Sequence, residues 1–360
     1  MVIEQYTIAT TPKYNFPQPN MDTTLPQRLI ELSLHSLKHA QNQPIQLNQQ
    51  LFQQTNNIDV QPQTLQLKLQ PILLHAKHEE TIVAAVDTSS MKIGETATGI
   101  LIAVRGANVW KQNKNYRYIR LGPFIFHITE ENKKEVYNAL QRAYFNSPHE
   151  QNQSSPNLLQ MPTRIANLLE RWLQTMLTKT INNGLILFDG SLTSGTADTS
   201  TPLMREILET ARKRRNVVLA FSKMTTLRCN GHLITDILLE HKPPYLLETA
   251  GLKTKPPIVL LGDVYVARLT KGNCAFRLDI DKQVAPEQKI EAVEKLLGND
   301  LLSQSYPETL RLAHILCTFT ANEVIAMQHF TAHTYRLKII NRPDMHRLLF
   351  GPFGKGDANA

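Results

Sequence analysis

The order of the apolar segments along the chain constrains its fold more strongly than any other feature of the sequence. Three β-type runs come first and follow one another directly, at residues 82–87, 98–110 and 116–126. Two further apolar runs alternate with segments of helical periodicity, at residues 184–190 and 216–222. Strands adjacent in sequence pair as antiparallel neighbours, whereas strands separated by helices are typical of parallel additions to a sheet. The sequence therefore predicts a mixed sheet flanked by helices.

Helical periodicity and further β-type runs complete this pattern. Helices are predicted over residues 26–40, 130–144, 164–180, 202–212, 286–297 and 307–328, and strands over 257–268 and 274–280. Three strands in tandem, followed by alternating helices and strands, is the order of an RNase H-like α/β core. Doubly wound nucleotide-binding folds and integrin-type metal domains share part of this order. We therefore predict an α/β fold of the RNase H-like class, with extensions at both ends.

The chain divides into three predicted parts. Residues 1–80 hold a Thr- and Pro-rich arm, a helix and a Gln-rich segment. Such a segment is either a solvated linker or a partly ordered surface layer. Residues 81–328 hold the α/β domain, and residues 329–360 form a tail with enough apolar side chains to pack against another surface.

Composition limits the classes of protein to which the chain can belong. Of 360 residues, 42% are hydrophobic, which supports a sizeable core and excludes a disordered chain. The formal net charge of +8 is a weak indication of a polyanionic partner such as nucleic acid. Cys229, Cys274 and Cys317 form no CxxC pair, so they predict neither a disulfide framework nor a structural zinc cluster. Because no membrane span or signal peptide can be recognised, we expect a cytoplasmic protein without membrane attachment.

Two aspartates stand where predicted strands end. Asp87 closes the first run in AVDTSS, and Asp189 closes a later run in LFDGSL. Ligands collect at the carboxyl ends of strands in open α/β sheets, and neighbouring strands lie about 4.8 Å apart. Either aspartate alone is more simply a cap of the following turn, but two adjacent buried carboxylates repel each other unless a cation compensates them. The pair therefore predicts a divalent-metal site.

Further candidate site residues lie on or beside predicted helices. Glu170, in RIANLLERW, adjoins an apolar helix face, although a salt bridge with Arg171 or exposure to solvent is the simpler interpretation of the pattern. The segment YPETLRLAH carries Tyr306 and, about two turns later, His314, which shares a face with Cys317. A histidine on such a face is usually a core residue, but beside two aspartates it can bind metal or transfer protons.

Taken in order, AVDTSS, Glu170, LFDGSL and YPETLRLAH resemble the NurA nuclease family over roughly residues 80–320. The resemblance implies an RNase H-like core, a homodimer and DNA cleavage that depends on Mn²⁺ or Mg²⁺. It also implies a HerA-type hexameric ATPase as translocase partner in DNA end resection, with 5′-to-3′ exonuclease and single-strand endonuclease action. By this resemblance Asp87, Glu170 and Asp189 are metal carboxylates, and Tyr306 and His314 are the C-terminal active-site pair. The first 80 residues have no counterpart in the resemblance.

Phosphodiester hydrolysis gives each of these residues an expected task. Two divalent cations about 3.5–4 Å apart activate a water and stabilise the leaving oxygen. We expect Asp87 to bridge the ions and Glu170 and Asp189 to complete their shells, with His314 favouring Mn²⁺ over Mg²⁺. Tyr306 is expected to hydrogen-bond a phosphate oxygen or to orient the water.

Basic residues offer candidate DNA contacts. Lys223 follows the strand at 216–222 and either reaches a phosphate from the same edge of the sheet or is an ordinary exposed lysine. The segment KQNKNYRYIR interleaves Lys114, Arg117 and Arg120 with two tyrosines. This pattern predicts either a surface that follows a DNA backbone and stacks bases or a solvated edge strand.

Two other classes of function stay open on the sequence alone. An actin- or sugar-kinase-like ATPase also begins with an aspartate in a first-strand turn, although AVDTSSMKIG and LFDGSLTSG are poor Gly-rich phosphate loops. A non-catalytic DNA-binding adaptor of a translocase is the second class, and it would not need the full set of carboxylates.

Overall fold

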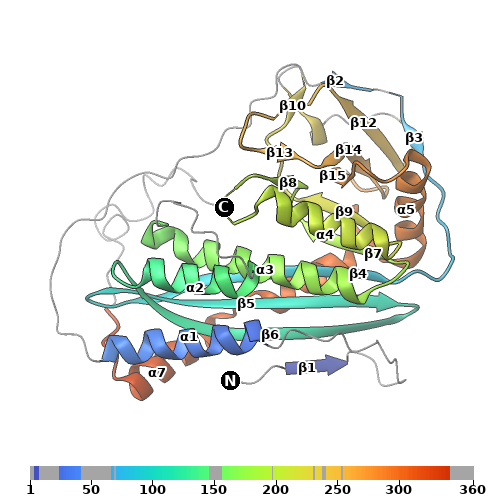
Figure 1. Ribbon diagram of the computed structural model, residues 1–360. Helices are drawn as coiled ribbons and strands as arrows, with labels where there is room; N and C mark the ends of the chain where they lie inside the picture. The colour runs from blue at the N-terminus through green and yellow to red at the C-terminus, as the bar shows by residue number, and fades with distance from the viewer. Residues whose placement is uncertain are drawn as a thin grey trace, which may run out of the picture.

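The computed structural model describes residues 4–7, 24–41, 66–68, 70–145, 156–196, 198–229, 232–236, 241–252 and 254–340. Figure 1 shows a continuous sheet with helices on both of its sides, and the long strands β5 and β6 lie under α2 and α3. Most of the Gln-rich segment, residues 42–65, and the end of the tail, residues 341–360, lie outside the described residues.

Five strands form the core of the sheet. They are β4 (Val83–Glu95), β5 (Gly99–Gln112), β6 (Asn115–Thr129), β7 (Leu185–Asp189) and β9 (Val217–Ser222). Their spatial order is β6-β5-β4-β7-β9. Strand β5 is antiparallel to β4 and β6, whereas β7 is parallel to β4 and β9. The first strand of the set is thus central, with the second and third on one side and the fourth and fifth on the other, which confirms the predicted RNase H-like order.

The sheet continues at both ends beyond these five strands. Past β9 come the antiparallel strands β15 (Phe276–Asp281), β14 (Gly262–Arg268) and β12 (Tyr245–Ala250). At the edges, β1 (Glu4–Thr7) pairs with β6, while β2 (Gln66–Leu67) and β3 (Ile72–Leu73) pair with β12. Residues of the first 80 therefore contribute strands to both edges of the sheet, and the division at residues 80 and 328 stays a prediction.

Helices cover both faces of the sheet. On one face α2 (Lys133–Phe145), α3 (Met161–Thr180) and α4 (Thr201–Lys213) enclose a core that includes Ile186 and Phe188. On the other, α5 (Pro286–Asn299) and α6 (Glu308–Cys317) enclose a core that includes Leu185 and Leu187. Alternate residues of β7 thus face opposite cores, which is why this strand is apolar throughout. Towards the end of the long strands, α1 (Thr24–Gln41) and α7 (Ala321–Tyr335) share a smaller core.

Short elements complete the described chain. They are the pairs β8 (Thr193–Ser194) with β13 (Val259–Leu260), β10 (Arg228–Cys229) with β11 (His232–Leu233) and β16 (Leu302–Ser303) with β17 (Tyr306–Pro307), and the 3₁₀ turns Leu158–Gln160 and Ile234–Asp236. Within the described ranges, no helix combines the length and apolar character that a membrane crossing requires.

Two predicted elements are wrong in extent. The first strand does not end at Asp87 but continues to Glu95, because β5 remains its hydrogen-bonded partner beyond the end of β7. The helix predicted over 307–328 is two helices, α6 and α7. Thr320 and Glu323 form a reciprocal capping box there, which satisfies the first N–H groups of a new helix.

Candidate active site

The pairing of β4 with β7 places Asp87 and Asp189 side by side. The parallel ladder reaches Val86 opposite Phe188, so the next residues in step are the two aspartates. Side chains alternate along a strand, and the residues two positions earlier in each strand are buried against α5 and α6. Both carboxylates therefore point to the same face of the sheet.

A turn at Gly190 ends β7 directly after Asp189. Gly190 has a φ of +104°, a conformation that side chains larger than hydrogen rarely adopt. Its N–H donates to the carbonyl of Phe221, and its own carbonyl accepts from the hydroxyl of Ser222, both at 2.8 Å. The turn thereby fixes the position at which Asp189 leaves the sheet.

Helix α6 brings His314 to Asp87. The Nδ1 atom of His314 lies 2.7 Å from Oδ2 of Asp87, whose Oδ1 accepts the N–H of Thr88 at 2.8 Å. The Asp87 side chain is buried, whereas that of His314 is 53% exposed. The imidazole therefore connects a buried carboxylate to the surrounding solvent.

Asp189 has a lysine and a tyrosine as neighbours. Lys223 donates from Nζ to Oδ2 of Asp189 at 2.7 Å, and the same Nζ lies 5.7 Å from the centre of the Tyr306 ring. Tyr306 is buried and packs against two phenylalanine rings. Burial, followed by the charges of Asp189 and Asp87, raises the pKa of Tyr306. Its hydroxyl therefore keeps its proton and can act only as a neutral donor or acceptor.

Glu170 reaches the same neighbourhood from α3, on the opposite face of the sheet. Its Oε1 accepts from Nε2 of Gln174 at 2.9 Å and from Nη2 of Arg171 at 3.2 Å. The ion pair with Arg171, which was the simpler interpretation of the sequence, is therefore present. Even so, Asp87 and Asp189 lie close enough for their charges to act on this carboxyl.

Burial and like charge disfavour the charged forms of Glu170 and Asp87 in this cluster. Burial raises the pKa of Glu170 to about 7, with Asp87 and Asp189 adding to the rise and Arg171 opposing it. Burial and the charge of Asp189 raise the pKa of Asp87, although His314 and Lys223 oppose this. A bound cation would favour the charged forms of these carboxyls. Carboxylate oxygens are ligands that suit Mg²⁺ or Mn²⁺.

The predicted metal ligands do not all converge to ligand distance. Among the described residues, the group whose ligand atoms lie within 4.8 Å of one another is Asp87, His314 and Cys317. Asp189 and Glu170 lie in the same electrostatic environment but are paired with other side chains. Cys317 was not predicted as a ligand, although its position three residues after His314 on a helix was a usable signal.

The predicted DNA contacts are only partly assembled around the site. Arg120 of β6 lies opposite the same residue of β5 that Asp87 of β4 faces from the other side. Arg120 also makes an ion pair with Glu323 at 3.3 Å. Lys114, by contrast, lies in the β5–β6 turn, next to the start of β4 and so at the opposite edge of the sheet. The two tyrosines of this segment are partly buried against the core under α5 and α6, and base stacking on this segment stays a prediction.

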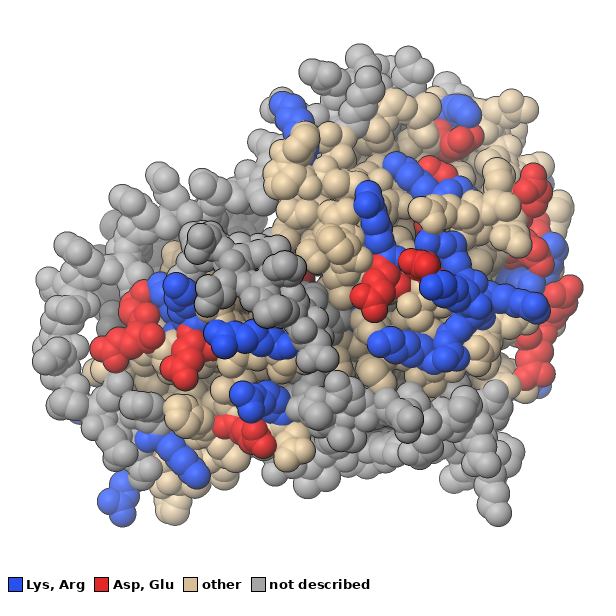
Figure 2. Space-filling view, in the orientation of Figure 1, with Lys and Arg blue, Asp and Glu red and all other residues tan. Residues whose placement is uncertain are grey.

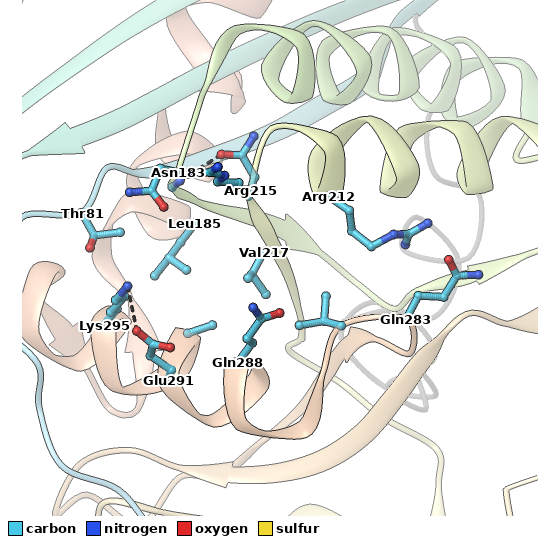
Figure 3. A pocket seen from close by; sticks show the side chains of 14 residues that line it. Thr81, Asn183, Leu185, Arg212, Arg215, Val217, Gln283, Gln288, Glu291 and Lys295 are labelled. Atoms are coloured by element: carbon cyan, nitrogen blue, oxygen red, sulfur yellow. Dashed lines mark hydrogen bonds and ion pairs between the residues drawn. The ribbon is translucent and has the colours of Figure 1, made fainter.

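The edge of the sheet opposite the aspartates also has a pocket. It lies at the starts of β4, β7 and β9 and contains Gly184, Asn216, Glu291 and Lys295. Figure 3 shows Lys295 turned towards Glu291, and their ion pair measures 2.9 Å. Figure 2 shows Lys and Arg gathered over α4 and α5 with acidic side chains among them. Lys295 at this edge is therefore paired with an acidic side chain.

No protein-family model and no curated protein matches this chain in sequence. Among solved structures it is similar to the NurA nuclease from Sulfolobus solfataricus, with a TM-score of 0.47 and 17% identity over 73% of this chain and 88% of that one. It is also similar to Endonuclease V from Bacillus subtilis (TM-score 0.33, 11% identity, 73% and 88%) and to the C-terminal lobe of a budding yeast Argonaute (0.26, 10%, 72% and 51%). Because similarities this low carry no information on activity, the function has to be inferred from the residues of this chain.

Proposed function

We propose that this protein is a divalent-metal-dependent nuclease that hydrolyses phosphodiester bonds of DNA at the edge formed by Asp87 and Asp189. The observation that carries the proposal is the in-step pairing of these two carboxylates, with Glu170 electrostatically coupled to both. Such a cluster is costly unless a cation binds it. It also lies where a substrate reaches an α/β sheet, at the carboxyl end of a parallel strand.

We assign the cation to the carboxylates of Asp87, Asp189 and Glu170, with His314 beside them. When bound, Mn²⁺ or Mg²⁺ supplies positive charge for the phosphate and lowers the pKa of a water, and two ions divide these tasks between the attacking and leaving oxygens. Asp87 and Asp189 would hold the cation in a fixed position, because the β4–β7 ladder fixes the strand ends that carry them.

The remaining residues act on the substrate and its protons. His314 is oriented by Asp87 and partly exposed, so it can take up or release a proton at the surface of the site. The protonated Tyr306 hydroxyl can donate to a phosphate oxygen. Lys223 is 37% exposed and can exchange its bond to Asp189 for a phosphate once a cation compensates Asp189.

A cleavage assay with labelled single- and double-stranded DNA in Mn²⁺, Mg²⁺ or EDTA tests the proposal. We expect cleavage with the metals, none in EDTA, and a loss of at least about a thousandfold in Asp87→Ala. Glu209→Gln is the matched control, because it removes an exposed carboxylate on α4. Metal-dependent cleavage by folded Asp87→Ala would reject the mechanism. ATP turnover without DNA cleavage would instead favour the actin- or kinase-like class.

The finer assignments follow from the resemblance of the sequence motifs to the NurA family. They are a role in DNA end resection and recombinational repair, 5′-to-3′ exonuclease with single-strand endonuclease action, a homodimer, a HerA-type hexameric translocase partner and a cytoplasmic location. Product analysis on end-labelled DNA, light scattering of the purified protein and co-purification with a HerA-type ATPase test them separately. A monomer, or cleavage from 3′ ends, would contradict the corresponding assignment and leave the metal site untouched.

A further inference from the structure

Cys317 is a buried thiol beside the site that the proposed hydrolysis does not use. It lies one helical turn after His314 on α6, so both side chains share a face of the helix. Its Sγ donates to the carbonyl of His314 at 3.2 Å. Burial, and then the charge of Asp87, raises the pKa of Cys317, which places the thiol in direct electrostatic contact with that carboxylate.

Three different donor atoms meet at this point. One ligand atom each from Asp87, His314 and Cys317 lies within 4.8 Å of the others. Ligands around a tetrahedral zinc ion are roughly 3.5 Å apart, as follows from metal–ligand distances of about 2.0–2.3 Å. Small side-chain rotations therefore suffice to close the group around one ion.

We propose that Asp87, His314 and Cys317 form a binding site for a borderline-soft divalent cation of the zinc class. An oxygen, a nitrogen and a sulfur donor are the three ligand types that zinc accepts, and water can take the fourth position. Thiolate ligands select zinc-like ions over Mg²⁺ and Mn²⁺, which prefer oxygen. The thiol loses its proton to solvent when it binds the ion.

The shared ligand gives this site a consequence for the proposed hydrolysis. Asp87 belongs both to the zinc-class group and to the carboxylate cluster assigned to Mn²⁺ or Mg²⁺. A zinc-class ion bound by His314 and Cys317 of α6 draws the Asp87 carboxylate towards these two residues. This consequence rests on the proposed function, whereas the binding itself does not.

Cobalt(II) is the probe for the binding, because a cobalt–thiolate bond gives a charge-transfer absorption band in the near ultraviolet. The full-length protein, freed of metal with a chelator that is then removed, is titrated with Co²⁺ in the absence of DNA. We expect this band to saturate at one equivalent and to disappear on addition of Zn²⁺. Absence of the band in the wild-type protein would overturn the proposal.

Variants locate the ligands. Cys317→Ala should remove the band and weaken Co²⁺ binding by at least about tenfold, and His314→Ala, at a half-exposed position, should weaken it similarly. Cys229→Ala is the matched control, because Cys229 is also a buried free cysteine but lies in another core. A band that persists in Cys317→Ala, or is lost in folded Cys229→Ala, would overturn the assignment. If Cys317→Ala fails to fold, the His314→Ala titration decides. None of these readouts requires cleavage, so their failure is distinguishable from failure of the nuclease proposal.

Discussion

The two edges of the same parallel strands are built on opposite principles. Where β7 and β9 begin, Asn216 accepts from the N–H of Gly184 at 2.9 Å and donates to the carbonyl of Ile181 at 2.7 Å. The pocket at this edge has a basic and an acidic side chain in contact (Figure 3). Where β7 ends, Asp87 and Asp189 stand side by side, and burial together with the charge of Asp189 raises the pKa of Asp87. One edge satisfies its polar groups, while at the other burial and like charge disfavour the charged form of Asp87 even with His314 and Lys223 beside it.

This difference separates stability from function within one sheet. Substitutions at the Asn216 edge should reduce the free energy of unfolding without changing the chemistry. Substitutions at the aspartate edge should change the chemistry and can even stabilise the metal-free protein. The four predictions that follow test this separation.

The largest expected effect on stability is that of Asn216→Ala. The substitution leaves a buried N–H and a buried carbonyl without partners, at a cost of about 1–3 kcal/mol each. We expect the free energy of unfolding, measured with urea, to fall by roughly 2–4 kcal/mol. Asn182→Ala, at an exposed position in the neighbouring α3–β7 loop, should change it by about 0.5 kcal/mol or less. Equal losses in both variants would contradict the difference between buried and exposed positions.

Glu170→Gln should stabilise the metal-free protein, and the gain should depend on pH. The pKa of Glu170 is about 7 in the fold and 4.5 in the unfolded chain, so the folded state holds a proton that the unfolded state has lost between these values. Wild-type stability therefore falls as pH rises from 4.5 to 7. The variant lacks this loss. The difference in free energy of unfolding between Glu170→Gln and the wild type is therefore absent below pH 4.5 and is on the order of 1–3 kcal/mol above pH 7. Unfolding curves at pH 4.5 and 8 without metal measure it, and a pH-independent difference would contradict the account.

Lys223→Met should strengthen binding of Mn²⁺. The lysine occupies Oδ2 of Asp189 and competes with an incoming cation. Because the pair is partly exposed, its strength is roughly 0.2–1 kcal/mol, so we expect up to about a fivefold gain in affinity by calorimetry. Lys213→Met, which removes an exposed lysine paired on α4, is the control. Weaker Mn²⁺ binding in Lys223→Met would mean that the lysine supports the cation site instead of competing with it.

Lys114→Ala should have the smallest effect. A lysine that contacts a phosphate contributes about 0.9 to the slope of log affinity against log salt. Because Lys114 lies at the edge away from Asp87, we expect this slope to stay unchanged for DNA bound at the active site. A decrease near 0.9 would show that the DNA path extends to the β5–β6 turn.

The sequence predicted the parts of the molecule that local patterns determine. The strand order and the adjacency of Asp87 and Asp189 follow from where apolar runs stop and from the alternation of strands and helices. The segment YPETLRLAH singled out Tyr306 and His314, and the resemblance to a nuclease family gave them their expected role. The structure brings both to the aspartates.

What the sequence did not predict depends on partners distant along the chain. The length of β4 is set by its neighbour β5, and β12 gained no prediction because its six residues carry no clear period. The proximity of Cys317 to Asp87 requires α6 to lie over β4, which no local pattern of either segment specifies. For the same reason the place of Lys114 at the edge away from the site could not be predicted before the register of β5 with β4 was known.

A crystal structure of the wild-type protein grown with Mn²⁺ and without zinc-class ions tests the central claim most directly, because anomalous scattering locates the ion. The account predicts an anomalous peak bound by the carboxylates of Asp87 and Asp189, with Lys223 displaced from Asp189. Saturating Mn²⁺ with no peak at these carboxylates, and with the Lys223–Asp189 pair intact, would contradict it.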